Sequence, residues 1–351
     1  MKLTVHTNPA YEILIEDGCL QQIGRQAKVL LPKAKRTVLV TDSHVGPLYV
    51  QSVKEALEAA GFTVFVQAFP AGEQSKNLQT ISSFYRAFAQ AGLTRTDFAV
   101  ALGGGVCGDM TGFAAATWLR GIPFIQVPTT LLAQVDSSVG GKTGVDLPEG
   151  KNLVGAFHQP ALVLIDPQTL ATLPETFFAD GMGEVIKYGC IRDKAFFDHL
   201  CREDCRRWLP EVLFTCADIK RQVVEKDERD TGERAILNFG HTFGHALERV
   251  QHYSGLTHGK AVGIGMVLMA QLGEASGITA PGTATQIQSL LEQYGLPSSS
   301  PVRIDDLLPA TAYDKKNSGS SIQLVLLKTI GECLTRDIPR TELSALCEAL
   351  R

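Results

Sequence analysis

Five short apolar runs in the first half of the chain predict buried strands. They cover residues 36–42, 62–69, 97–102, 122–128 and 162–166. Mostly apolar runs of this length are typical of strands buried on both faces, as in a parallel sheet. Residues 53–60 and 78–91, which lie between them, carry the spacing of amphipathic helices. This alternation predicts an α/β layer fold with a parallel sheet.

The pattern changes after Pro174. Helical spacing then dominates, at residues 195–208, 211–225, 243–250 and 259–274. We therefore expect a boundary near residue 175, with an α/β domain at 1–175 and a mainly α-helical domain at 176–351. The serine- and glycine-rich segments 298–300 and 317–321 are predicted to be surface loops.

Composition narrows the class of protein. The 351 residues carry a formal net charge of −4, which argues against a nucleic-acid partner. The N-terminal segment lacks the apolar core of a signal peptide, and the apolar run 261–270 is too short to cross a bilayer. The eight cysteines contain no C-x-x-C pair, which favours reduced thiols over disulfides or a cysteine zinc site. We expect a cytoplasmic protein with no membrane partner.

A glycine-rich loop directly follows the predicted strand 97–102. Gly103, Gly105 and Gly108 form G-x-G-x-x-G before a predicted helix at 109–119. Glycines there let the backbone approach a pyrophosphate, and a helix N-terminus attracts negative charge. The alternative is a tight turn without a ligand, but the position between strand and helix favours a phosphate site.

The acid that usually accompanies this motif is missing. A dinucleotide-binding unit places an acid about 20 residues further on, at the end of the next strand, to hold the ribose. This chain has Pro128, Thr129 and Thr130 there. Asp42, at the end of an earlier predicted strand, is a candidate for that role.

A second glycine cluster covers residues 136–144 and continues at 150–152. Its Gly-Lys-Thr fragment is not a P-loop, because that motif would need glycine at the position of Asp136. Lys142 and Lys151 in flexible, glycine-rich backbone suit the anionic oxygens of a ligand. The alternative is a pair of solvated surface lysines.

Histidines and a carboxylate in the second half predict a metal site. His241 and His245 are spaced i and i+4, His258 follows, and Glu184 precedes Lys187 by one helical turn. Two imidazoles and one carboxylate with an open position make a plausible catalytic zinc shell. Spacing alone favours His241 and His245 as paired ligands, and the alternative is a single structural histidine.

Cations and an amide flank this histidine segment. They are Lys220, Lys226, Arg234 and Asn238. Beside a metal they indicate a phosphorylated, hydroxylated substrate, although a basic helix face is often merely solvated.

Taken together, six segments resemble the 3-dehydroquinate synthase family in order and spacing. They are residues 103–113, 128–133, 135–144, 150–152, 183–188 and 237–245. The resemblance implies an N-terminal domain with a Rossmann-like NAD⁺ site and a helical C-terminal domain with Zn²⁺ or Co²⁺. It also implies a homodimer in which Arg120 reaches the substrate of the neighbouring subunit.

The resemblance assigns residues to three sets. The implied metal ligands are Glu184, His241 and His258, which moves His245 to the substrate set. The implied NAD⁺ contacts are Asp42, Glu73, Lys76, Gly104, Gly105, Val106, Asp109, Thr129, Thr130, Lys142, Lys151, Thr169 and Thr172. The implied catalytic and substrate residues are Asp136, Lys142, Asn152, Lys187, Lys220, Arg234, Asn238 and His245, with Arg120.

The implied activity is a phosphate-eliminating lyase of the shikimate pathway. It would convert 3-deoxy-D-arabino-heptulosonate 7-phosphate to 3-dehydroquinate and phosphate, by transient oxidation with NAD⁺, elimination, reduction and aldol closure. One alternative is another sugar phosphate cyclase, of the valiolone or inosose type. A metal-dependent NAD polyol dehydrogenase is a second. A non-enzymatic NAD-sensing protein is a third, and it leaves the cations and histidines without a role.

Overall fold

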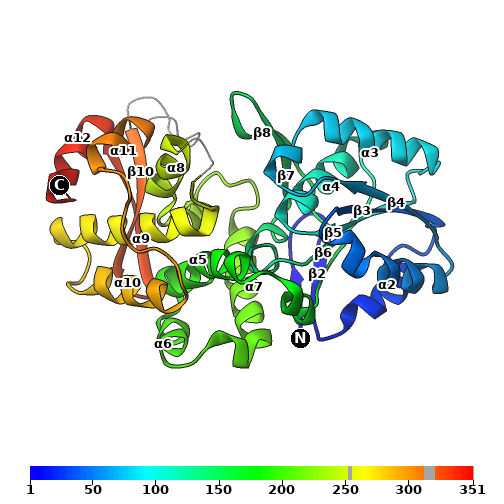
Figure 1. The fold of residues 1–351 in the computed structure, drawn as a ribbon, viewed down its shortest axis with the longest axis horizontal. Coiled ribbons are helices and arrows are strands. Elements are labelled where there is room, and N and C mark those ends of the chain that lie inside the picture. The colour runs from blue at the N-terminus through cyan, green and yellow to red at the C-terminus, as the bar shows by residue number, and fades with distance from the viewer. Residues whose placement is uncertain (252–254, 312–320, 351) are drawn as a thin grey trace. The chain divides into compact units, whose positions relative to one another are not determined.

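The computed structural model describes residues 1–251, 255–311 and 321–350, and it divides into two compact units (Figure 1). Unit 1 comprises Met1–Pro174 and Leu213–Arg229, and unit 2 comprises Glu175–Val212 and Asp230–Arg351. The prediction of a single boundary near residue 175 assigned 213–229 to the second domain. In the structure this segment packs within unit 1.

A seven-stranded sheet forms the centre of unit 1. Its order is β1-β2-β9-β6-β5-β3-β4. The strands are β1 (Lys2–Val5), β2 (Tyr11–Ile15), β3 (Arg36–Asp42), β4 (Thr63–Phe69), β5 (Phe98–Gly103), β6 (Phe124–Pro128) and β9 (Leu162–Ile165). The five predicted strands are confirmed, but the sheet is mixed, because β1 pairs antiparallel with β2. These two strands alternate between buried and less buried positions, so they lack the continuous apolar run that revealed the others.

Helices cover both faces of this sheet (Figure 1). They are α1 (Ile23–Leu30), α2 (Gly46–Ala59), α3 (Leu78–Gln90) and α4 (Gly105–Thr117). Along β3, Val38 and Val40 belong to the core cluster of α3 and α4, whereas Leu39 belongs to the cluster of α1 and α2. Because successive side chains of a strand point to opposite faces, the apolar run within β3 contributes to the core on both sides of the sheet.

Residues 142–144 and 150–152 of the second glycine cluster lie in an antiparallel hairpin, and not in the flexible backbone that their composition predicts. Strands β7 (Lys142–Leu147) and β8 (Gly150–Phe157) pair with Gly144 opposite Gly155. Hydrogen bonding between the two strands orders this backbone, and glycine content alone does not reveal such pairing.

Unit 2 is mainly helical, as predicted. Its helices are α5 (Glu175–Arg192), α6 (Lys194–Arg202), α8 (His241–Val250), α9 (His258–Ala275), α10 (Thr283–Gln293), α11 (Ile304–Thr311) and α12 (Arg340–Leu346). Helix α7 (Leu209–Lys226) begins in unit 2 and continues into the segment assigned to unit 1. No helix of the described ranges has both the length and the hydropathy of a transmembrane span.

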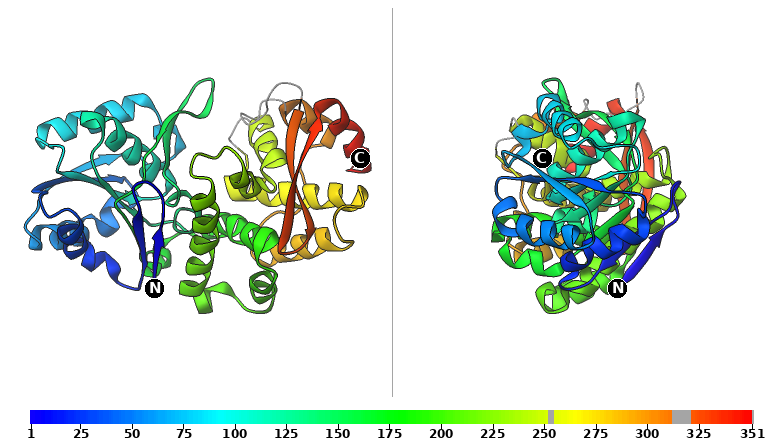
Figure 2. Two further views of the ribbon diagram at one scale, coloured as in Figure 1. Left: turned by 180° about the vertical axis from the view of Figure 1, so that it is seen from behind. Right: turned by 90° about the vertical axis from the view of Figure 1, so that its right-hand side faces the viewer.

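Two details of unit 2 differ from the predictions, and one agrees with them. The hairpin of β10 (Ser321–Thr329) and β11 (Glu332–Pro339), drawn in orange and red in Figure 2, was not predicted. The predicted helix 195–208 ends at Arg202, and a 3₁₀ turn, η6 (Cys205–Trp208), follows. Residues 298–300 lie in a loop as predicted, whereas 317–320 lie outside the described residues.

Backbone contacts join α5, α8 and α9. A Cβ added to Gly259 of α9 would lie 1.8 Å from the carbonyl oxygen of Asp180 in α5. One added to Gly265 of α9 would lie 2.0 Å from the carbonyl oxygen of Gly240, the residue before α8. Only glycine permits helices to approach this closely, so the two positions determine how α9 packs against its neighbours.

We expect Gly265→Ala to lower the free energy of unfolding by about 2 kcal/mol, because its methyl group overlaps backbone that cannot move aside cheaply. Gly263→Ala is the matched control on the same helix. The three atoms nearest to its Cβ would all belong to the flexible side chain of Leu291, the closest a methyl carbon at 3.0 Å. Alanine's better helix propensity, about 1 kcal/mol, should then leave stability unchanged or raised. Chemical denaturation followed by circular dichroism measures both, and equal effects would contradict the packing argument.

Candidate functional site

The carboxyl ends of three neighbouring parallel strands meet at one edge of the sheet in unit 1. Strands β3, β5 and β6 end at Asp42, Gly103 and Pro128. Asp42 accepts hydrogen bonds from the backbone N–H groups of His44 and Val45, at 2.8 and 3.0 Å. A Cβ added to Gly103 would lie 3.3 Å from Oδ2 of Asp42. The structure therefore places the candidate acid of the earlier strand directly beside the glycine loop.

The glycine loop forms the first turn of α4. The helix begins at Gly105, four residues before the predicted start at 109, and no side chain caps its N-terminus. A Cβ added to Gly108 would lie 2.5 Å from Oε1 of Gln126 on β6, so this glycine lets the helix pack closely on the strand. An uncapped N-terminus at the carboxyl edge of an α/β sheet is suited to binding an anionic group. Val106 lies within this first turn, and Gly104 directly precedes it.

The threonines of the predicted NAD⁺ set follow the carboxyl ends of β6 and β9. The N–H of Thr129 donates to the carbonyl of Gly103 at 3.0 Å, and Thr130 follows it. Thr169 and Thr172 lie in the 3₁₀ segment η5 (Pro167–Thr172), which follows β9. There the hydroxyl of Thr169 accepts a hydrogen bond from Nε2 of Gln134 at 2.9 Å.

A buried ammonium group links other residues of the predicted NAD⁺ and substrate sets. Nζ of Lys76 donates to Oδ2 of Asp109 at 2.7 Å and to Oδ1 of Asn152 at 2.6 Å, and it lies 3.9 Å from Oε1 of Glu73. Burial lowers the pKa of Lys76, but Asp109 and Glu73 outweigh it and raise that pKa. Burial raises the pKa of Asp109 by more than Lys76 lowers it. Lys76 is therefore a permanent cation that orients Asp109 and Asn152.

A second buried lysine pairs with a half-buried carboxylate far away in the sequence. Nζ of Lys220, on α7, lies 2.8 Å from Oδ1 of Asp136 and donates to its carbonyl at 2.6 Å. Asp136 lies in the π-helical turn η4 (Ala133–Ser137). The pair forms because residues 213–229 pack within unit 1. Lys142 is the first residue of β7, and Lys151 lies in β8.

In unit 2, Glu184, His241 and His258 form a donor cluster. Glu184 lies on α5 with a side chain that is 1% exposed, whereas His241 and His258 are the first residues of α8 and α9. Oε1 of Glu184 lies 3.5 Å from Nε2 of His241 and 3.4 Å from Nε2 of His258. One ligand atom from each residue lies within 4.8 Å of the others. Two imidazole nitrogens and one carboxylate oxygen are a donor set that suits Zn²⁺ or Co²⁺.

Charges inside the cluster are balanced by neighbours. Nζ of Lys187 forms an ion pair with Oε2 of Glu184. Burial lowers the pKa of His241 well below its usual range. Burial also lowers the pKa of His258, but contacts with Glu184 and Glu248 outweigh it and raise that pKa to about 10. A metal that binds Nε2 of His258 must therefore displace a proton.

The i, i+4 pair expected from spacing alone is not the arrangement in the structure. The rings of His241 and His245 are 5.3 Å apart between centroids, but the donors grouped with His241 are those of Glu184 and His258. His245 is exposed, and its own donor group contains Glu248 and His258. Spacing along one helix could not reveal a partner that comes from another.

The remaining predicted residues occupy two turns. Arg234 and Asn238 lie in the 3₁₀ segment η7 (Glu233–Asn238) of unit 2, and Arg234 is 2% exposed. Arg120 ends the 3₁₀ turn η3 (Trp118–Arg120) of unit 1 and is exposed. Leu119 and Arg120 both have positive φ, 50° and 69°. Two successive non-glycine residues in this region are strained, as is common where a turn presents a functional side chain.

Two buried carboxylates beside the cluster were not predicted. Oδ1 of Asp180 on α5 accepts the backbone N–H groups of Gly259 and Lys260, at 2.7 and 3.3 Å, and so caps α9. Oε2 of Glu248 on α8 lies 3.6 Å from Nδ1 of His258. The sequence contains a signal for each: Asp180 precedes Glu184 by one helical turn, and Glu248 follows His245 by one.

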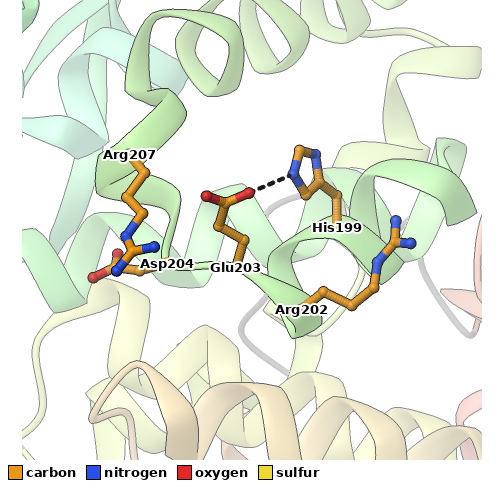
Figure 3. A pocket seen from close by; sticks show the side chains of 5 residues that line it. All are labelled: His199, Arg202, Glu203, Asp204 and Arg207. Carbon is orange, nitrogen blue, oxygen red and sulfur yellow. Dashed lines mark hydrogen bonds and ion pairs between the residues drawn. The ribbon is translucent and has the colours of Figure 1, made fainter.

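A groove of about 570 Å³ in unit 2 contains none of the predicted site residues (Figure 3). Its lining side chains are His199, Arg202, Glu203, Asp204 and Arg207. Nε2 of His199 lies 3.3 Å from Oε2 of Glu203, and the two acids balance the two arginines. The groove therefore does not coincide with the polar clusters described above.

The fold and these clusters define a class of protein. It has an α/β unit with a glycine-rich loop at the carboxyl edge of its sheet, and a helical unit with a Glu–His–His set around a buried glutamate. Family models described as 3-dehydroquinate synthase N-terminal and C-terminal match residues 66–180 and 181–317.

Two curated 3-dehydroquinate synthases extend this match. The enzyme of Clostridium botulinum (strain Alaska E43 / Type E3) is 47% identical over 328 residues, which are 92% of this chain and 93% of that protein. The enzyme of Streptococcus suis (strain 05ZYH33) is 45% identical over 350 residues, which are 98% of each. The chain belongs to the 3-dehydroquinate synthase family, and the resemblance seen in the sequence motifs is confirmed.

Solved structures confirm the fold. A 2-epi-5-epi-valiolone synthase from Streptomyces hygroscopicus subsp. jinggangensis 5008, with NAD⁺ and Zn²⁺ bound, is 27% identical with a TM-score of 0.86, covering 97% of this chain and 96% of its own. A 2-deoxy-scyllo-inosose synthase in complex with carbaglucose-6-phosphate, NAD⁺ and Co²⁺ is 24% identical with a TM-score of 0.87, covering 99% of both chains.

The ion pair of Lys76 and Asp109 allows the coupling free energy of a shielded ion pair to be compared with that of an exposed one. A double-mutant cycle with Lys76→Met and Asp109→Asn should give a coupling free energy above about 1 kcal/mol, since each single change leaves a shielded charge unpaired. Lys54 and Glu58 are the matched control, because they are also 2.7 Å apart but are 33% and 43% exposed. Their coupling should be about 0.3–0.5 kcal/mol. Chemical denaturation measures both, and equal couplings would contradict the role of burial.

Proposed function

We propose that this chain converts 3-deoxy-D-arabino-heptulosonate 7-phosphate to 3-dehydroquinate and phosphate. The proposal rests on the Glu184–His241–His258 cluster, found in a chain that belongs to the 3-dehydroquinate synthase family. The enzyme would be a lyase that depends on NAD⁺ and a divalent metal, and its location in the cytoplasm stays a prediction.

The metal is proposed to bind Glu184, His241 and His258. Both imidazoles turn Nε2 toward Oε1 of Glu184, and the three donors come from three different helices. Zn²⁺ in the valiolone synthase and Co²⁺ in the inosose synthase are compatible with this donor set. When bound, the metal would act as a Lewis acid on substrate hydroxyls.

NAD⁺ is proposed to bind at the carboxyl edge of the sheet in unit 1. The uncapped N-terminus of α4 suits the pyrophosphate, and Asp42 lies within reach of the glycine loop as a ribose partner. NAD⁺ would supply a hydride acceptor and would be regenerated within each turnover.

Three buried cations are proposed to hold the anionic groups of the substrate. Lys187, Lys220 and Arg234 are 2%, 5% and 2% exposed. Cations held in such shielded positions interact with a phosphate or carboxylate more strongly than solvated ones. The further substrate residues proposed are Asp136, Lys142, Asn152 and Asn238.

His245 is proposed to orient the substrate or relay protons. Its exposed position at the edge of the donor cluster leaves it accessible to a substrate in a way that His241 is not. The departing phosphate can itself accept a proton, so substrate positioning contributes more than a strong base.

Sequence identity favours the 3-dehydroquinate synthase reaction over the reactions of related cyclases. The curated 3-dehydroquinate synthases are 45–47% identical to this chain, against 27% for the valiolone synthase. A valiolone- or inosose-type reaction is therefore the second candidate. A metal-dependent polyol dehydrogenase would leave NADH as a product, which provides a direct distinction.

The purified chain should release phosphate from the heptulosonate phosphate only when NAD⁺ and a divalent metal are both present. Chelation should abolish release, and added Zn²⁺ or Co²⁺ should restore it. No NADH should accumulate, because the cofactor is regenerated. A phosphate assay and NADH absorbance measure the two, and other sugar phosphates serve as control substrates. Release that is indifferent to metal, or NADH formed in step with product, would contradict the proposal.

A homodimer with shared residues is the final part of the proposal. Arg120 sits in an exposed, strained turn, which suits a side chain that reaches a neighbouring subunit. Arg120→Ala and Lys187→Ala should each lose most activity, and mixed dimers should recover part of it. Mass spectrometry verifies the mixing. Mixed dimers that remain inactive would show that Arg120 does not act on the neighbouring subunit.

A further inference from the structure

A second carboxylate faces His258 from the side opposite to Glu184. Glu248 on α8 has a side chain that is 5% exposed, and its Oε2 lies 3.6 Å from Nδ1 of His258. The other ring nitrogen, Nε2, lies 3.4 Å from Oε1 of Glu184. We infer that Glu248 is a positioning residue that accepts the Nδ1–H of His258 and holds Nε2 toward the metal. The inference rests on the proposed metal site but concerns a residue outside its ligand set.

The periodicity of α8 explains why Glu248 reaches this position. His241 and Glu248 are seven residues apart, which is about two helical turns, so both lie on the same side of α8. Helices α8 and α9 pack closely at Gly244, where an added Cβ would lie 3.2 Å from the backbone of Ala261. The side of α8 that supplies a proposed ligand therefore also supplies the second carboxylate.

The backbone of His258 is already held by another residue. Asp180 accepts the N–H groups of Gly259 and Lys260, and no hydrogen bond from the side chain of Thr257 caps α9. The remaining freedom of His258 is rotation of its ring. A carboxylate on Nδ1 restricts that rotation and selects the tautomer whose Nε2 can bind a metal.

The other proposed histidine ligand is oriented in the same way. Nδ1 of His241 lies 3.2 Å from the carbonyl oxygen of Phe239, which can only accept, and its Nε2 faces Glu184. Both imidazoles thus present Nδ1 to an acceptor of the protein and Nε2 to the same carboxylate. A carboxylate on one ring and a carbonyl on the other is a common way of fixing metal-binding histidines.

A different role for Glu248, as a ligand, fits the geometry less well. His245, Glu248 and His258 also bring three donor atoms within 4.8 Å of one another. Because Glu248 faces Nδ1 of His258, an ion bound there would lie on the ring nitrogen turned away from Glu184. The set with Glu248 as a ligand would also depend on His245, which is exposed. The proposed ligand set instead contains Glu184, whose side chain is 1% exposed.

The test measures metal binding by the purified full chain. Dissociation constants for Zn²⁺ come from competition with a chelator, and the visible spectrum of the Co²⁺ form reports the geometry of coordination. The variants are Glu248→Ala and the isosteric Glu248→Gln, with Glu184→Gln as the reference for loss of a ligand. Glu274→Gln is the matched control, because the side chain of Glu274 on α9 accepts the backbone N–H of Ala284 at 2.8 Å and belongs to neither donor group.

Glu248→Ala should weaken Zn²⁺ binding by about 10- to 100-fold and shift the Co²⁺ spectrum, yet still bind one metal ion per chain at saturation. Glu248→Gln retains an acceptor, so its loss should be smaller. If Glu248→Ala does not fold, the comparison of Glu248→Gln with Glu274→Gln still decides the question.

Three results would overturn the inference. Wild-type affinity and spectrum in both Glu248 variants would show that Glu248 does not orient His258. Loss of the metal in Glu248→Gln as complete as in Glu184→Gln would make Glu248 a ligand. A wild-type chain that binds neither Zn²⁺ nor Co²⁺ would overturn the proposed metal site together with this inference, which separates that failure from the first two.

Discussion

The close backbone contact between α5, α8 and α9 is the constraint on which the buried donor cluster depends. Gly259 and Gly265 allow α9 to lie against the backbone of its neighbours, at a cost of about 1 kcal/mol each in helix propensity. That approach brings the first residues of α8 and α9 to the middle of α5. A side chain on either glycine would displace α9 and would therefore move the histidines apart.

Unit 1 depends on a different geometric rule, namely that neighbouring parallel strands end at the same edge. Asp42, the glycine loop and the threonines after β6 converge there although they are far apart in the chain. The return of residues 213–229 to this unit adds Lys220, which pairs with Asp136. The polar groups of the edge are thus assembled by the order of the strands and by one returning helix.

Buried cations in both units are paired with carboxylates. Lys76 with Asp109, Lys220 with Asp136 and Lys187 with Glu184 illustrate the pattern. Burial of either partner alone would be costly, so each cation stays paired with its carboxylate. A phosphate or a metal that binds at these positions would compete with a partner within the protein. Binding there should therefore rearrange the ion pairs, and the metal proposed for Glu184 would take one partner from Lys187.

The amino-acid sequence by itself determined the five parallel strands, the main helices and the family, because apolar runs and glycine motifs are local patterns. It did not reveal β1, β2 or the hairpin of β7 and β8, whose order comes from strand partners. The sets of site residues stay predictions: the resemblance grouped Glu184, His241 and His258, and the tertiary structure brings donor atoms of these three residues close together. His258 joins His241 and Glu184, and Glu248 faces the other nitrogen of the same ring. These contacts depend on how separate helices pack, which no spacing along one helix records.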